Sequence, residues 1–343
     1  MITRAGGRAP TRNSSSWIIP ASAAVLLIAP GAVATRGRTE RVNLSPRLRA
    51  GQTISYHVSY HSDKQVKTES PVVSASPPDS ARTDVHALLR LEILDLQPRG
   101  KGLAIHARTR FEILNSDSHF RTPNLAAPAP QVQGEHEEPK ANSIEFTLLR
   151  DGRLEDVKGL DALLPEQQQA WQEWASRFAL AAAFPARGAR MAQKVKSEEP
   201  EKSPSPIAGL RWIRESTYVR NEPCGPVNMT VEGDLAASDA EPDSCAVILT
   251  TATLKQQSSP AKATPEDFKI RELRTAGTAR GTNRIITYIA LKTGLLVRAT
   301  EEANQNMDVT VAKSDGSNRV RYNVAAKSHS EVLLVSGSPL THP

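Results

Sequence analysis

The C-terminal part of the chain, from Gly281 to Val335, constrains the fold more than any other stretch. It contains four runs of strand length, RIITYIAL, LLVRATE, MDVTVAK and RVRYNVAA. Short loops with a glycine follow the first run, at Lys292–Gly294, and the third, at Ser314–Ser317. Glycine readily takes the positive φ that such turns need, so these runs predict an antiparallel meander. Its inward residues, which need an apolar partner elsewhere in the chain, are Val309, Val311, Val320, Tyr322 and Val324.

The N-terminus has the three-part layout of a secretory signal peptide. Residues 1–16 hold three arginines and no acid, and an apolar run from Trp17 to Ala34 follows and ends in Ala-Val-Ala. Signal peptidases cleave after small residues in this arrangement, so we expect cleavage after Ala34 and export to the periplasm or the cell exterior. The alternative is an uncleaved membrane anchor. The helix-breaking residues within the run argue against an anchor, namely Pro20, Pro30 and Gly31.

Removal of this segment weakens the charge argument for a nucleic-acid partner. The formal net charge of +6 falls to about +3 without the three arginines of residues 1–16, which is a small excess for a nucleic-acid binder. Aromatic residues make up 4% of the chain and leave few platforms on which bases could stack. We therefore expect no nucleic-acid partner and, after cleavage, no transmembrane segment.

The chain has two cysteines, Cys224 and Cys245. An oxidising compartment would let them pair. Closing this loop would stabilise the fold by about 3 kcal/mol in the chain-entropy model. A redox or metal-binding pair would need closer spacing or further ligands, and neither is present. The sequence therefore favours a structural disulfide.

Polar and apolar residues alternate in several segments before the meander, which predicts further strands. These segments are Thr53–His61, Val85–Leu96, Leu103–Leu114, Ser143–Leu149, Leu154–Val157, Arg211–Val219, Cys245–Leu254 and Phe268–Arg274. Residues 35–50 are expected to form a flexible lead-in and Ser197–Gly209 a linker. Asn115–Asn142, rich in proline, alanine and charge, is expected to form a flexible loop. Residues 51–337 should form one β-rich domain.

One convincing helix runs from about Pro165 to Phe184. Proline suits the first helical position. Trp171, Trp174 and Phe178 recur at helical spacing and form one apolar stripe. Polar side chains lie largely off this stripe, at Gln168, Gln172, Glu173 and Arg177. The expected fold is mainly β, an antiparallel twisted sheet or incomplete β-barrel packed against this helix, which would give the meander its apolar partner.

The stripe of Trp171, Trp174 and Phe178 allows two interpretations. If the sheet closes over it, the three side chains are core, and their burial stabilises the fold at about 25 cal/mol per Å². If the sheet is open and curved, the same side chains line an apolar cavity that could hold a lipid-like ligand.

Local signatures of catalysis, metal binding or cofactor binding are absent from the chain. It contains no Gly-x-Ser-x-Gly, His-Glu-x-x-His, P-loop or Gly-x-Gly-x-x-Gly motif. His57 and His61 would lie about 13 Å apart along a strand, too far to share one ion. The cluster Glu135–Glu138 lacks the ligand spacing of a calcium loop. We expect no enzymatic activity, no metal and no cofactor, although a Ser/His/Asp set assembled from distant loops would leave no local signature.

Several segments carry a resemblance to known proteins: AVILTTATL, ATPEDF, GTNRIITYIALKTGLLVRATEE and NMDVTVAKSDGSNRVRY. They resemble uncharacterised secreted bacterial proteins of similar length, to which no activity is assigned. The pattern of an apolar helix between strands is similar to the Lol-type periplasmic lipoprotein carriers, whose curved sheets shield an acyl chain. This second resemblance implies an architecture and no functional residues.

We therefore expect an exported, non-enzymatic envelope protein that binds an apolar or lipid-like ligand on the sheet face beside the helix. The candidate lining residues are Trp171, Trp174 and Phe178. The alternatives are a structural or protein-interaction module of the envelope and, third, a hydrolase without a sequence signature.

Overall fold

The computed structural model describes residues 41–70, 78–99, 102–121, 143–184, 188–200, 205–224, 244–256 and 264–337. Within these ranges, eleven strands form a single sheet, and the one long helix is α1 (Pro165–Ala183). The expected mainly β, antiparallel fold is confirmed. The signal peptide with its cleavage site lies outside the described residues.

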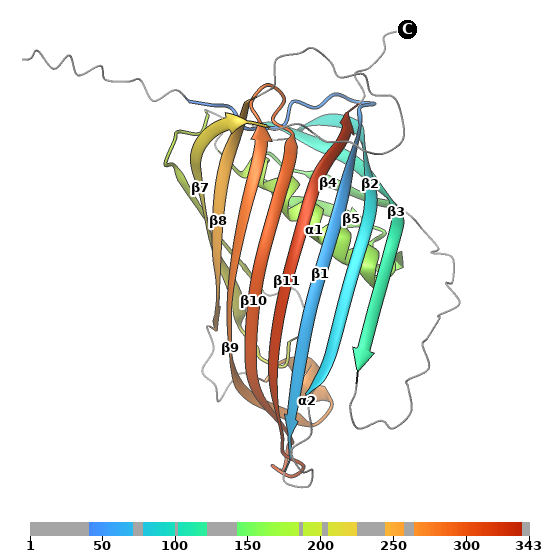
Figure 1. The fold of residues 1–343 in the computed structure, drawn as a ribbon, viewed down its shortest axis with the longest axis vertical. Coiled ribbons are helices and arrows are strands. Elements are labelled where there is room, and N and C mark those ends of the chain that lie inside the picture. The colour runs from blue at the N-terminus through green and yellow to red at the C-terminus, as the bar shows by residue number, and fades with distance from the viewer. Residues whose placement is uncertain are drawn as a thin grey trace, which may run out of the picture. The chain divides into compact units, whose positions relative to one another are not determined.

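The sheet consists of two meanders that meet in its middle. The first contains β1 (Thr53–Glu69), β2 (Asp79–Arg99), β3 (Gly102–Arg121), β4 (Ser143–Leu148) and β5 (Leu154–Lys158). The second contains β6 (Lys194–Pro200), β7 (Leu210–Pro223), β8 (Ser244–Gln256), β9 (Leu273–Ala290), β10 (Leu296–Lys313) and β11 (Val320–Gly337). The two join where β11 pairs with β1, antiparallel like every other neighbouring pair (Figure 1). The strand order runs from β5 at one end to β6 at the other, so the sheet is open and these two strands are its edges.

Helix α1 connects the two edges of the sheet, because it follows β5 and precedes β6 in the chain. Figure 1 shows it crossing one face of the sheet. At its start, the Gln167 side chain accepts a hydrogen bond from the Leu164 amide at 3.1 Å, which satisfies a backbone donor there. The helix ends at Ala183, and Phe184 is extended, as expected for a residue that precedes a proline.

The main buried cluster contains residues of α1 together with residues of β1–β4 and the adjoining parts of β10 and β11. Trp174 is fully buried; its ring lies 4.8 Å from that of Phe178 and 5.8 Å from that of Tyr56. Phe146 of β4 contacts both Trp171 and Trp174 edge-on, each at 6.0 Å. An aromatic side chain buries roughly 150–250 Å², so each ring contributes several kcal/mol to the stability of this cluster.

The C-terminal meander has three strands and not the expected four. LLVRATE and MDVTVAK belong to one strand, β10, because the polar residues between them continue the pairing with both β9 and β11. The expectation that α1 covers the inward residues of this meander is wrong for Val309 and Tyr322. These two pack in a separate cluster around Leu210 and Leu254, further along the strands than the cluster that contains α1.

Three other segments differ from the expectation. Residues Asn115–Arg121 continue β3, because they pair with β2 although most of them are polar; residues 122–142 of the expected loop lie outside the described ranges. Ser197–Pro200, expected in a linker, belong to the edge strand β6. Phe268 lies in a short helix, α2 (Glu266–Ile270), and not in a strand. The two acidic residues of the first turn favour a helix there.

The segment of residues 41–50 packs along the ends of the strands. Val42 and Ala189 exchange two backbone hydrogen bonds, of 2.9 and 2.7 Å. Leu44 and Leu48 are buried, with 1% and 7% of their surface exposed. The Arg47 amide donates to the Thr293 carbonyl at 2.8 Å. This segment therefore forms part of the folded structure.

Cys224 and Cys245 form the disulfide that the sequence predicts, with their Cα atoms 4.9 Å apart. Disulfides are typical of proteins outside the cytoplasm. Among the helices in the described ranges, none has the length and apolar character needed to cross a membrane.

Candidate functional site

A pocket of about 600 Å³ lies beside α1, and we name it the helix-side pocket. Its walls come from α1, from β5 and the turn before it, and from β6 to β9; they include Leu154, Trp171, Ala175, Ala179, Leu180 and Ser197. The edge strands β5 and β6 stand at opposite ends of the strand order, yet both line this pocket. The pocket is therefore the space that the open sheet leaves between its two edges along α1.

Trp171 borders this pocket. Only 5% of the residue is exposed, and its indole Nε1 has no hydrogen-bond partner in the part of the chain that the structure describes. A buried donor without an acceptor costs about 1–3 kcal/mol.

The other two candidates from the stripe lie in the core. Trp174 and Phe178 are 0% and 1% exposed and do not line the helix-side pocket. The stripe thus divides between two environments: two rings fill the space between helix and sheet, and the third borders the pocket.

A buried ionic network adjoins the pocket through Arg177, which lines it. Arg177 donates to Glu173 at 2.6 Å and to the Ser330 hydroxyl at 3.2 Å, and it also forms an ion pair with Glu301 of β10. The Ser330 hydroxyl donates to Glu173 at 2.9 Å, and Asn283 donates to Glu301. Burial lowers the pKa of the Arg177 guanidinium, while the charge of Glu173 acts in the opposite direction.

Sequence reasoning missed this network. Glu173 and Arg177 lie off the apolar stripe, which suggests a solvated face, but only 14% and 5% of their side chains are exposed. The helix is enclosed on more than one side, so its polar flank also faces protein. The spacing of four residues between the two charges was the available signal.

Among the described residues, the charges that line the helix-side pocket are balanced. Its acidic residues are Asp151, Glu155 and Glu198, and its basic residues are Arg153, Arg177 and Arg214. Arg153 pairs with Asp151 at 2.8 Å. The Ser216 and Thr250 hydroxyls hydrogen-bond to each other at 2.8 Å. The pocket can therefore take an apolar group along the alanines and leucines, and it offers hydroxyls and no net charge to a polar one.

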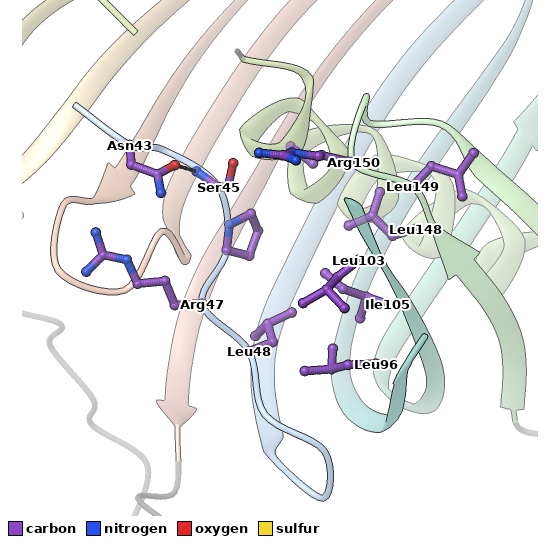
Figure 2. Close-up of a pocket in the computed structure, with 12 residues that line it drawn as sticks. Asn43, Ser45, Arg47, Leu48, Leu96, Leu103, Ile105, Leu148, Leu149 and Arg150 are labelled. Atoms are coloured by element: carbon purple, nitrogen blue, oxygen red, sulfur yellow. Dashed lines mark hydrogen bonds between the residues drawn. The ribbon is translucent and has the colours of Figure 1, made fainter. Parts of the chain in front are cut away.

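A second pocket, of about 390 Å³, lies where the segment of residues 41–50 meets the β2–β3 hairpin and the turn after β4; we name it the leucine pocket. Figure 2 shows Leu48, Leu96, Leu103 and Ile105 gathered together, with Arg150 and Arg47 on different sides of this group. Leu103 is 55% exposed. No local sequence pattern predicts this pocket, since its walls come from segments that are distant in the chain.

The histidines considered as metal ligands lie on the sheet. The His57 ring stacks on that of His86 with centroids 5.7 Å apart. His61 contacts Asp84 at 2.5 Å and Asp63 at 2.8 Å; these hydrogen bonds, with that to Asp84 the larger influence, raise the pKa of His61. Across the described ranges, no group of three or more His, Cys, Asp and Glu side chains has the arrangement of a metal site.

Fold and pockets together define a class of protein: an open antiparallel sheet whose two edges are linked by one helix that borders a pocket. No family model and no curated protein matches the chain.

Two of the solved structures that are similar to it share 8% sequence identity each with this chain. One is a Bacteroides fragilis protein provisionally described as exported, with a YmcC-like fold; the match covers 87% of this chain and 100% of that chain, with a TM-score of 0.25. The other is OccK11 (OpdR) of Pseudomonas aeruginosa, with 83% and 98% covered and a TM-score of 0.16. TM-scores this low support no argument, and the resemblance to Lol-type carriers is not shown.

Proposed function

We propose that this chain is an exported, non-enzymatic protein of the cell envelope, released by cleavage after Ala34, that binds a lipid-like ligand in the helix-side pocket. The observation that carries the proposal is a pocket along α1 whose walls include Leu154, Trp171, Ala175 and Ala179. An acyl chain would place its apolar groups against Trp171, Ala175 and Ala179.

The size of the pocket supports this class of ligand. At about 600 Å³ it falls within the range of about 300–1,000 Å³ that is usual for small-molecule sites. Each methylene group that leaves water contributes about 0.8 kcal/mol, so burying a chain of ten carbons offers about 8 kcal/mol against the cost of association. The balanced charges of the walls favour a head group without net charge.

The lining residues favour binding over catalysis. They include the hydroxyls of Ser176, Ser197, Ser216 and Thr250, but no histidine or cysteine among the described residues. A serine nucleophile needs an adjacent base to lose its proton. The carboxylate and guanidinium groups of Glu173, Arg177 and Glu301 instead pair with each other.

The alternative is a structural or interaction module that adds a partner's strand to a free sheet edge. Strand β5 has five residues, which offers a short template. Strand β6 carries charged side chains on its outward face, where Lys194 and Lys196 pair with Glu215 at 2.6 and 3.5 Å. Short edges and charged edge residues oppose strand addition, so ligand binding is the better supported function.

The test is calorimetric titration with monodecanoylglycerol, a neutral single-chain amphiphile, below its aggregation concentration. Ser197 is an exposed residue of β6 that lines the pocket, and Lys196 beside it is exposed but does not line the pocket. Ser197→Phe should weaken binding about tenfold or more, because the ring occupies the pocket, whereas Lys196→Phe should change it less than about twofold. Equal effects of both variants, or no binding to the natural chain, would refute the proposal.

A further inference from the structure

The leucine pocket differs from the helix-side pocket in its charge. Among the described residues, its walls contain two arginines, Arg47 and Arg150, and no aspartate or glutamate. The two pockets share no lining residue. A ligand of the leucine pocket therefore meets a positive environment, whereas the charges around the helix-side pocket cancel.

The guanidinium of Arg47 is held in place by a neutral group. It donates to the Lys292 carbonyl at 2.8 Å, and no carboxylate in the described ranges forms an ion pair with it. A backbone carbonyl fixes the direction of the side chain but leaves its charge uncompensated. An arginine fixed in this way is well suited to an anionic group, since its remaining N–H donors keep their fork geometry.

Apart from Asn43 and Ser45, the rest of the described wall is apolar. Leu48, Ile105 and Leu148 are 7%, 8% and 0% exposed and belong to the main buried cluster, while Leu103 beside them is 55% exposed. The pocket is thus an opening into the apolar core, and the half-exposed leucine is part of its wall (Figure 2). Apolar walls of this kind with a few placed polar groups are typical of small-molecule sites.

From these observations we infer that the leucine pocket is a second binding site, for a single-chain amphiphile with an anionic head group. The alkyl chain lies against Leu48, Leu103 and Ile105, and the head group is held by Arg47, which no described carboxylate neutralises. This inference does not depend on the proposed function, because it rests on different residues, a different ligand charge and a separate titration.

One feature of the fold opposes anion binding in the leucine pocket, and its effect has to be compared with that of the arginine. Ala182, in the last turn of α1, also lines the pocket, and the C-terminal end of a helix carries a partial negative charge. This end weakens anion binding by about twofold to fivefold. A charge-assisted hydrogen bond from one arginine strengthens it by about tenfold to a hundredfold. The gain in anion affinity from one arginine is therefore larger than the loss caused by the helix end.

The experiment compares ligands that share one chain and differ in the head group. Decanoate and decyl phosphate carry anions and decyltrimethylammonium a cation; each is titrated calorimetrically below its aggregation concentration. Both anions should bind, at least tenfold more tightly than the cation. A preference between the two anions assigns the natural head group to a carboxylate or a phosphate. Absence of binding, or equal binding of anion and cation, would overturn the inference.

Matched variants locate the binding. Leu103 and Leu114 lie on the same strand and are 55% and 54% exposed, but only Leu103 lines the pocket. Leu103→Asp should weaken decanoate binding at least tenfold and Leu114→Asp less than twofold. Arg47→Gln should remove most of the preference for the anion, and Arg49→Gln, outside the pocket, should leave it in place. An equal loss from Leu114→Asp, or a full preference in Arg47→Gln, would contradict the site.

Discussion

Arg177 of α1 forms an ion pair with Glu301 of β10, and only 5% and 12% of the two side chains are exposed. The pair joins residues far apart in the chain and sits beside the helix-side pocket. A buried charge is tolerated when its partners compensate it, and here Glu173 and Ser330 complete the set. The network therefore fixes how α1 lies against β10 and β11.

Removing the central charge should be costly. Arg177→Met leaves Glu173 and Glu301 buried without their cation, and we expect a loss of about 3–5 kcal/mol in the free energy of unfolding, measured by urea denaturation. Arg321→Met is the control: Arg321 pairs with Asp308 at 2.6 Å but is 51% exposed, so its loss should cost less than about 1 kcal/mol. Similar costs for the two variants would contradict the buried network.

Removal of the buried Tyr56 hydroxyl, in contrast, should not lower the free energy of unfolding. Tyr56 is fully buried, its burial raises the pKa of the phenol, and its hydroxyl has no hydrogen-bond partner within the described ranges. Tyr56→Phe keeps the ring contact with Trp174 and removes an unsatisfied group, so stability should stay equal or rise by about 1 kcal/mol.

Tyr218 provides the comparison for this variant. It is 1% exposed, and its hydroxyl donates to Asn221. Tyr218→Phe should therefore lower the free energy of unfolding by about 1 kcal/mol. A loss in Tyr56→Phe as large as in Tyr218→Phe would mean that the Tyr56 hydroxyl does have a partner.

The His61–Asp84 contact should make stability depend on pH. The pKa of His61 is raised above its ordinary value of 6.5, mainly by Asp84, and that of Asp84 is lowered below 3.8, mainly by His61, with Arg82 also bonded to it. The contribution of His61 is fully present below about pH 6.5 and lost as pH rises through its raised pKa; that of Asp84 is lost as pH falls through its lowered pKa.

The measurement is the difference in unfolding free energy between the natural chain and His61→Gln at several pH values. We expect the largest difference near pH 5 and a decline towards pH 8 or above. Because 33% of the His61 side chain is exposed, solvent screening should hold the difference below about 1 kcal/mol, and added salt should reduce it. A difference that grows with pH would show that the sign is wrong.

Gly277 marks a close approach of two strands. A Cβ there would lie 2.2 Å from the Asp308 carbonyl oxygen and 2.7 Å from the Val309 Cα, both backbone atoms of β10. These atoms cannot move without breaking the pairing, so Gly277→Ala should cost about 1–3 kcal/mol in thermal or urea unfolding. Thr278→Ala, its exposed neighbour, should cost less than about 1 kcal/mol. A stabilising Gly277→Ala would contradict this close approach.

The sequence predicted the strands well where side chains alternate, because the period of two is a local property. It predicted their ends poorly. Asn115–His119 and the middle of β10 are mostly polar, and they are strands because neighbouring strands satisfy their backbone groups. A partner strand that is distant in sequence leaves no mark on the local pattern.

The candidate sites depend even more on distant pairing. Trp171 was predicted from helical spacing, but its place at the pocket border follows from the arrangement of β5 and β6 at the two edges of the sheet. Glu301 meets Arg177 because β10 pairs with β11, which in turn pairs with β1. Alternation within a strand does not specify this order, so neither the network nor the leucine pocket could be derived from the sequence.

Native mass spectrometry of the protein purified from its host without detergent shows whether the helix-side pocket carries a lipid-like ligand in the cell. We expect a co-purifying mass of lipid-like composition that is released on unfolding, is retained in Lys196→Phe and is reduced in Ser197→Phe. A natural chain that carries no such mass and acquires none when incubated with host lipid extract would contradict this expectation.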